Sequence, residues 1–117
     1  MGWDAYAVTP GVDTDHGPFL TPELEEVFRK AGSTTWLDGT CCGLLRRATG
    51  IPDYDETSVD GTLLWSPETV RKAHASANWD IPLEEFEEYQ RAEELLPWAR
   101  DFLKLCASNG LGIWFSW

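Results

Sequence analysis

The sequence predicts a single α+β domain, in which a small sheet that includes both terminal strands packs against three to five helices. The chain has 117 residues, a length that suits one domain. Its two clearest strand patterns lie at the two ends of the chain, and amphipathic helical patterns lie between them. Two such strands are stable when they pair in a sheet that helices cover. Because helices and strands do not alternate strictly, the order favours α+β over a βαβ repeat.

The first strand pattern covers residues 3–8, which are short and aromatic and end at Thr9-Pro10-Gly11. Residues 9–20 are rich in Gly, Pro and Asp and predict a loop. A helix begins at Thr21-Pro22-Glu23, where Thr suits the cap and Pro the first turn. Its apolar positions recur with helical spacing at Leu24, Val27, Phe28 and Ala31.

A connector over residues 33–39 includes a candidate short strand around Trp36. A second helix is predicted over residues 40–49, closing at Gly50, with Cys41 on its apolar stripe. Residues 51–61 form an acidic loop, and residues 62–65 predict a further short strand that would make the sheet three-stranded.

Ser66-Pro67-Glu68 repeats the helix-start signature, and this third helix ends near Asn78. The longest helix is predicted to open at Asp80-Ile81-Pro82 and to end at Asn109-Gly110, with a kink or a break near Leu96 because Pro97 removes a donor. Trp98 and Phe102 lie one turn apart on its most apolar part, so we expect both to be buried. Residues 111–117 form the last strand.

The net charge of the chain excludes more classes of function than any motif in the sequence does. The net charge is −11, from 20 acidic and 9 basic residues. Direct nucleic-acid binding requires a basic surface, and anionic membranes repel an acidic one. No apolar run approaches the roughly 18 residues of a membrane span, and the first residues lack a signal-peptide core. We therefore expect a cytoplasmic protein that binds neither nucleic acid nor membrane.

The acidic residues gather in segments 1–26, 51–68 and 80–94, whose net charges are −6, −5 and −6, whereas the remainder sums to +6. Such surfaces either keep a domain soluble or steer it onto a basic partner. We expect a partner-binding surface that uses the acidic residues of the second and third segments: Asp53, Asp55, Glu56, Glu84, Glu85, Glu87 and Glu88.

Seven tryptophans are unusual in a chain of this length. We expect most of them in the core and one to three of them exposed, where tryptophan serves as an interface anchor. Exposed tryptophan would also serve a homodimer, and the sequence leaves that alternative open.

Candidate catalytic and metal-binding residues are few. Cys42 is predicted to lie at a helix N-terminus and to point away from the apolar stripe, so it would be a thiol nucleophile with His74 as its base. Burial of Cys41 and a structural role for His74 are the stronger interpretation, and we expect Cys42 to be dispensable. Asp13, Asp15 and His16 lack the spacing of a calcium or zinc site, so no metal is predicted. No phosphate-loop motif occurs, and no cofactor is predicted.

These observations predict a small acidic interaction protein of the inhibitor or immunity type. It would bind and block a basic, nucleic-acid-handling protein, with its carboxylates in the place of phosphates, in bacterial or phage defence. The alternative is a small enzyme or ligand-binding domain that uses Cys42 and His74. A third alternative is a subunit of a larger complex whose charge only keeps it soluble.

Overall fold

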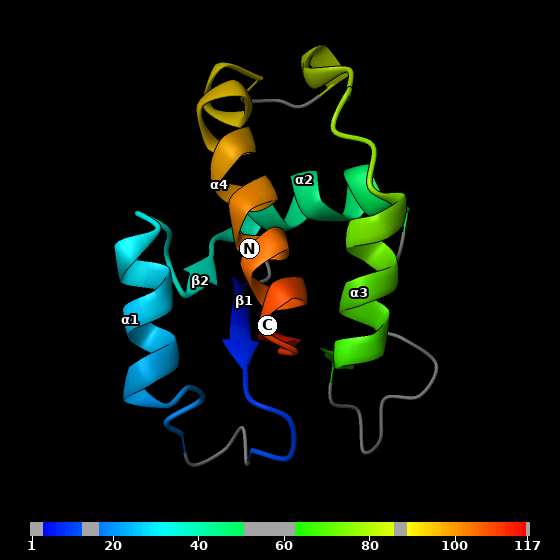
Figure 1. The fold of residues 1–117 in the computed structure, drawn as a ribbon. Helices are drawn as coiled ribbons and strands as arrows, with labels where there is room; N and C mark the ends of the chain where they lie inside the picture. The colour runs from blue at the N-terminus through cyan, green and yellow to red at the C-terminus, as the bar shows by residue number, and fades with distance from the viewer. Residues whose placement is uncertain (1–3, 13–16, 51–62, 86–88, 117) are drawn as a thin grey trace.

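The computed structural model describes residues 4–12, 17–50, 63–85 and 89–116 (Figure 1). The elements follow the order β1 (Asp4–Val8), α1 (Pro22–Lys30), β2 (Trp36–Leu37), α2 (Gly39–Thr49), β3 (Leu63–Trp65), α3 (Pro67–Ser76), the 3-10 helix η1 (Leu83–Glu85), α4 (Tyr89–Ser108) and β4 (Gly112–Ser116). The predicted α+β class is confirmed, with a small antiparallel sheet that contains the first and the last strand.

The two terminal strands are the centre of the sheet. Its strand order is β2-β1-β4-β3, and each neighbouring pair is antiparallel. β1 and β4 pair over five residues, from Asp4 opposite Ser116 to Val8 opposite Gly112. The candidate strand around Trp36 does form, so the sheet has four strands where three were expected.

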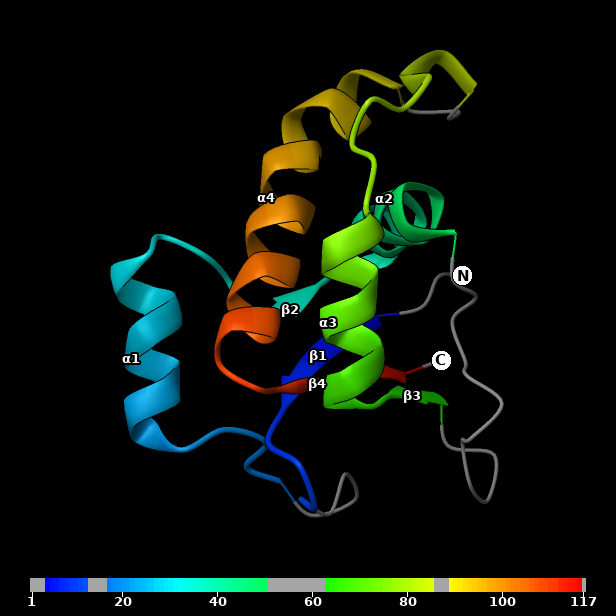
Figure 2. The same ribbon diagram turned by 45° about the vertical axis from the view of Figure 1, so that its right-hand side comes forward.

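The sheet has one face in the core and one face that the described helices leave uncovered. Figure 2 shows α2, α3 and α4 together on the same side of the sheet. The strand residues on that side are buried in the main hydrophobic cluster: Ala5, Ala7, Leu37, Trp65, Ile113 and Phe115. On the opposite side, the strand register sets Trp36, Tyr6, Trp114 and Leu64 in one row across all four strands.

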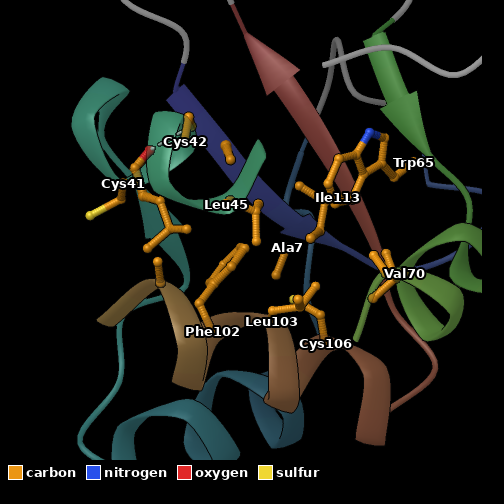
Figure 3. Close-up of a cluster of buried hydrophobic side chains, with 14 of the residues drawn as sticks. Ala7, Cys41, Cys42, Leu45, Trp65, Val70, Phe102, Leu103, Cys106 and Ile113 are labelled. Carbon is orange, nitrogen blue, oxygen red and sulfur yellow. Dashed lines mark hydrogen bonds between the residues drawn. The ribbon is translucent and has the colours of Figure 1, made fainter. Parts of the chain in front are cut away.

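The core lies between the sheet and α4 (Figure 3). Along α4, the buried positions form one stripe made of Ala92, Ala99, Phe102, Leu103 and Cys106. Phe102 packs against Phe28 of α1, with ring centroids 6.2 Å apart. This contact attaches α1 to the core, and it confirms the predicted burial of Phe102.

The predicted helix starts are correct because each carries a side-chain cap. Thr21, Asp38 and Ser66 stand at the N-caps of α1, α2 and α3, and each accepts a hydrogen bond from the backbone N–H three residues on. At the other end of α2, Gly50 has φ 69° and closes the helix in the left-handed conformation that glycine tolerates best. The Asp38 cap fixes the start of α2 directly after β2.

The predicted start of the longest helix is wrong. Residues 77–82 are not helical, η1 covers three residues, and α4 begins at Tyr89. Trp79, Ile81 and Leu83 pack against the core, whereas Asp80, Pro82 and Glu84 are exposed. Over the non-helical residues 79–82 this alternation has the period of extended backbone, which replaces the helical spacing expected there.

Pro97 does not break α4, which runs continuously past it to Ser108. The proline is exposed, on the side away from the buried stripe. Packing of that stripe against the sheet therefore holds the helix together despite the missing backbone donor.

Candidate functional site

Two of the exposed tryptophans meet at one groove. Among the described residues, the exposed large hydrophobic side chains are Val27 at 37%, Trp98 at 43% and Trp36 at 46% exposure. Trp36 and Trp98 both line a groove of about 210 Å³, which we call the Trp36–Trp98 groove. Exposed tryptophans are costly to leave in water, so their meeting at one concavity marks a candidate binding surface.

The groove lies where β2, the start of α2 and the first half of α4 come together. β2 supplies Trp36 and Leu37, α2 supplies Cys41, and α4 supplies Leu95 and Trp98. Thr34 and Asp38 complete the lining. The Thr34 hydroxyl donates a 2.6 Å hydrogen bond to the carbonyl of Trp36, which supports the backbone at this end of the sheet edge.

The expected burial of Trp98 is wrong. Trp98 and Phe102 are one turn apart on α4, yet Phe102 is fully buried and Trp98 is exposed. Trp98 lies at the flank of the buried stripe, next to β2 and the start of α2, where those elements leave a groove instead of a packing partner. Of the five tryptophans in the described residues, Trp65 is fully buried, Trp79 and Trp114 are half-buried, and Trp36 and Trp98 are exposed. The two exposed ones fall within the expected one to three.

Among the described residues that line the groove, Asp38 is the one with a charged side chain. Its Oδ1 accepts a 3.1 Å hydrogen bond from the backbone N–H of Cys41, and its carbonyl accepts one of 2.9 Å from Cys42. The capped helix start therefore holds the half-buried Asp38 carboxylate in place at the N-terminus of α2.

Further carboxylates lie beside Trp98 on α4. Glu94 is four residues before Trp98 and Asp101 is three residues after it, and both are exposed. Positions three and four apart share a helix face, so acids flank the tryptophan on its own side of α4. The Nε of Arg100 lies 3.6 Å from an oxygen of Asp101, so this second carboxylate is ion-paired, whereas Glu94 is exposed.

One end of the molecule is acidic. In Figures 1 and 2, η1 and the first turns of α4 project from the same end of the ribbon. The described carboxylates of this part, Asp80, Glu84, Glu93 and Glu94, are all exposed. Trp98 follows Glu94 by one turn, so the acidic end adjoins the groove along α4.

Only some of the acidic residues predicted to bind a partner lie within the described part of the structure. Glu84 is exposed on η1, and Glu85 belongs to the same short helix. Asp53, Asp55, Glu56, Glu87 and Glu88 lie outside the described residues, as do Asp13, Asp15 and His16.

The candidate catalytic pair is not supported by the position of its thiol. Cys42 was expected to point away from the apolar stripe, but it is buried, and its Sγ lies 3.9 Å from the carbonyl oxygen of Leu37. Because β2 runs directly into α2, the side of the helix that was expected to be open faces the core instead (Figure 3). His74 is exposed on α3. Within the described ranges, no group of three His, Cys, Asp or Glu side chains is placed to hold a metal ion.

The groove is not predicted from the sequence, although the sequence places both of its tryptophans in predicted elements. Its signal is Trp36-Leu37-Asp38, in which a strand residue is followed directly by a helix cap. Such a junction leaves the strand side chain at a corner where neighbouring elements diverge. No sequence feature indicates that α4 passes this corner at Trp98.

No family model, curated protein or solved structure matches the chain. In the part of the chain that the structure describes, no helix is both long and apolar enough to cross a membrane.

Proposed function

We propose that the protein is an acidic interaction protein of the inhibitor or immunity type, which binds a basic protein partner and blocks its nucleic-acid-handling surface. The Trp36–Trp98 groove is the anchor of the interface, and the acidic end that adjoins it steers the partner. The partner's basic surface would meet carboxylates in the place of phosphates.

One observation carries this proposal: two of the most exposed apolar side chains among the described residues line the same groove on a chain of net charge −11. Binding energy concentrates in a few buried aromatic anchors, which a groove with two tryptophans supplies. Charges at the rim add association rate and selectivity for an oppositely charged partner.

The alternative function, thiol catalysis by Cys42 and His74, gains no observation in its favour. A nucleophilic thiol has to be accessible and activated, whereas Cys42 is 2% exposed.

The test is affinity capture from the source organism with four immobilised proteins at low and at high salt. These are the wild type, Trp36→Ala, Trp98→Ala and the matched control Val27→Ala. Val27 is also exposed and apolar, but it lies on α1, outside the groove lining. The expected result is a basic protein that the wild type and Val27→Ala retain at low salt, that high salt releases, and that both tryptophan variants lose.

The captured protein is then purified, and its nucleic-acid-processing activity is titrated with each variant. Stoichiometric inhibition by the wild type and Val27→Ala, with weak inhibition by the tryptophan variants, supports the proposal. Equal capture by all four proteins, or a captured partner that is itself acidic, contradicts it.

A further inference from the structure

We infer that the Trp36–Trp98 groove receives one large apolar side chain, of leucine or phenylalanine size, from a basic segment of the partner. This inference rests on the proposed function, because it names the partner residue that anchors the complex. Three features of the groove support it: a floor made of core residues, polar side chains that already bond to the backbone, and a volume that suits one side chain.

The floor of the groove belongs to the hydrophobic core. Leu37 and Cys41 line the groove, although they are only 2% and 3% exposed and are members of the buried core cluster. α4 supplies the opposite wall, on which Leu95 is half-buried and Trp98 is exposed. An occupant that reaches the floor therefore meets apolar side chains from β2, α2 and α4.

Trp36 borders the groove at the edge of the sheet and is not the main wall. Its ring stacks on the ring of Tyr6, with centroids 6.5 Å apart, in the row of side chains on the outer face of the sheet. Trp98 is therefore the indole that we expect to pack against the occupant inside the groove.

The polar side chains of the described lining already have partners within the protein. The Thr34 hydroxyl donates to the carbonyl of Trp36, and the Asp38 carboxylate accepts from the backbone N–H of Cys41 as the cap of α2. A cation that entered would lose hydration beside a carboxylate that is already engaged. An apolar side chain has no such loss and gains free energy by leaving water.

The volume of the groove suits a single large side chain. The groove holds about 210 Å³, and an apolar cavity of about 150 Å³ is enough to bind a molecule of the size of benzene. Leucine and phenylalanine side chains are of this size, whereas alanine would leave most of the groove unfilled.

The charges near the groove indicate that the segment carrying this side chain is basic. Glu93 and Glu94 are exposed on α4 about one turn before Trp98, and Asp80 and Glu84 are exposed at the acidic end. Such carboxylates attract basic residues on either side of an apolar anchor. A second copy of this chain would bring its own net charge of −11 and be repelled, so a basic partner is the occupant that fits.

The test uses capped pentapeptides of sequence Lys-Gly-X-Gly-Lys, in which X is leucine, phenylalanine, alanine or arginine. Binding to the full-length chain labelled with ¹⁵N is followed through the tryptophan indole N–H signals, assigned by single Trp→Phe variants. The leucine and phenylalanine peptides should shift the Trp98 signal more than that of Trp114, which lies on the outer face of the sheet. Their affinity should exceed that of the alanine and arginine peptides by about 5-fold or more, in line with burial of a large apolar side chain.

Two matched truncations on α4 test the wall of the groove, with binding followed through backbone amide signals. Leu95→Ala should weaken the leucine peptide several-fold. Leu105→Ala should not, because Leu105 is also half-buried against the core but lies outside the groove lining. Trp98→Ala, which truncates an exposed side chain, should weaken the same peptide and keeps the test open if Leu95→Ala does not fold.

A leucine peptide with glutamate in place of both lysines tests the charge of the segment. It should bind more weakly than the lysine form at low salt, and the difference should shrink as salt rises. Equal binding of the two forms at low salt would contradict a basic segment.

Equal affinity for the leucine and alanine peptides, tighter binding of the arginine peptide, or no shift of Trp98 with any peptide would overturn the inference. So would a larger shift of Trp114 than of Trp98, which would place the apolar side chain on the outer face of the sheet. A Trp98 shift on concentrating the chain without peptide would assign the groove to a second copy and overturn it as well. The proposed function fails on a different result: Trp36→Ala and Trp98→Ala keep wild-type binding to the captured protein, or that protein is acidic.

Discussion

At the scale of single residues, Phe102 and Trp98 have different expected roles: Phe102 in the stability of the fold and Trp98 in binding a partner. Both are large aromatic side chains on α4, but Phe102 is fully buried against Phe28, whereas Trp98 is 43% exposed beside the groove. Burial makes a side chain important for folding, and exposure of a large indole leaves its surface free for a partner.

Phe102→Ala should therefore lower the free energy of unfolding by about 3–5 kcal/mol, the usual cost of such a truncation in a core. Trp98→Ala should cost less than half as much, because much of its surface is already in water. Urea denaturation of the two variants measures the difference. Equal losses of stability would show that Trp98 belongs to the core after all.

Cys106 gives a pH-dependent test of the core. Burial raises the pKa of the Cys106 thiol well above its ordinary value of 9.0. Above pH 9 the unfolded chain loses this proton and the folded chain keeps it, so the free energy of unfolding falls as the pH rises. One such group contributes up to about 1.4 kcal/mol per pH unit.

The stability difference between the wild type and Cys106→Ala should accordingly be constant below pH 8 and should move in favour of the variant between pH 9 and 10.5. Urea titrations across that range measure it. A pH-independent difference would mean that the thiol ionises as readily in the folded chain as in the unfolded one.

Residue-level prediction from the sequence was reliable where helical spacing and capping act together. The burial of Cys41, Phe28 and Phe102 followed from their apolar stripes. The predictions for Trp98 and Cys42 failed, because their exposure depends on where β2 and α2 lie relative to α4 and the sheet. Spacing along one helix carries no information about its neighbours.

At the scale of elements, close approach of β3 and β4 constrains Gly112. A Cβ added there would lie 2.7 Å from the backbone carbonyl oxygen of Trp65, on the paired strand. A backbone atom in a sheet moves only with the strand that carries it, so the contact is not relieved by rotating a side chain.

Gly112→Ala should therefore destabilise the fold by about 1–3 kcal/mol, as overpacking of a core does. The midpoint of urea denaturation measures the change. A midpoint within error of the wild type would contradict the described spacing of β3 and β4.

Comparison of the predicted and observed helices shows which sequence signals predict a helix start. Each helix start that carries a Thr, Asp or Ser cap was placed within about one residue, because the cap is a local hydrogen bond. The predicted start at Asp80 is wrong because Trp79 and Ile81 pack on the core while Asp80 and Pro82 are exposed, an alternation with period two in a non-helical segment. A helix cap can be predicted from the sequence because it is a local hydrogen bond. Over a segment as short as five residues, tertiary packing decides between a helical and an extended conformation.

At the scale of the whole molecule, the net charge of −11 sets how a partner approaches. Glu84 is exposed at the acidic end, and the sequence predicts Glu88 as part of the same charged surface. Long-range charges act mainly on the rate of association, and salt screens them over about 8–10 Å.

Reversal of Glu84 and Glu88 to Lys moves the net charge from −11 to −7, since two negative charges are removed and two positive ones added. Association with the basic partner should slow, the dissociation rate should change little, and the difference should shrink as salt rises. Stopped-flow kinetics at several salt concentrations measure this. If the double variant associates at the wild-type rate at low salt, the acidic end does not steer the partner and is only a solvated surface.

The groove, in contrast, should govern how long the complex lasts. Anchors buried at an interface act mainly on dissociation, and Trp36 and Trp98 are the side chains placed to be buried by a partner.

The most direct test is the dissociation rate of the complex with the captured basic protein, measured by surface plasmon resonance for the wild type, Trp98→Ala and the control Val27→Ala. Trp98→Ala should dissociate about 30-fold faster, the equivalent of a hot-spot loss near 2 kcal/mol, with nearly unchanged association. Val27→Ala should match the wild type. A folded Trp98→Ala protein that dissociates at the wild-type rate would contradict the groove as the partner-binding site.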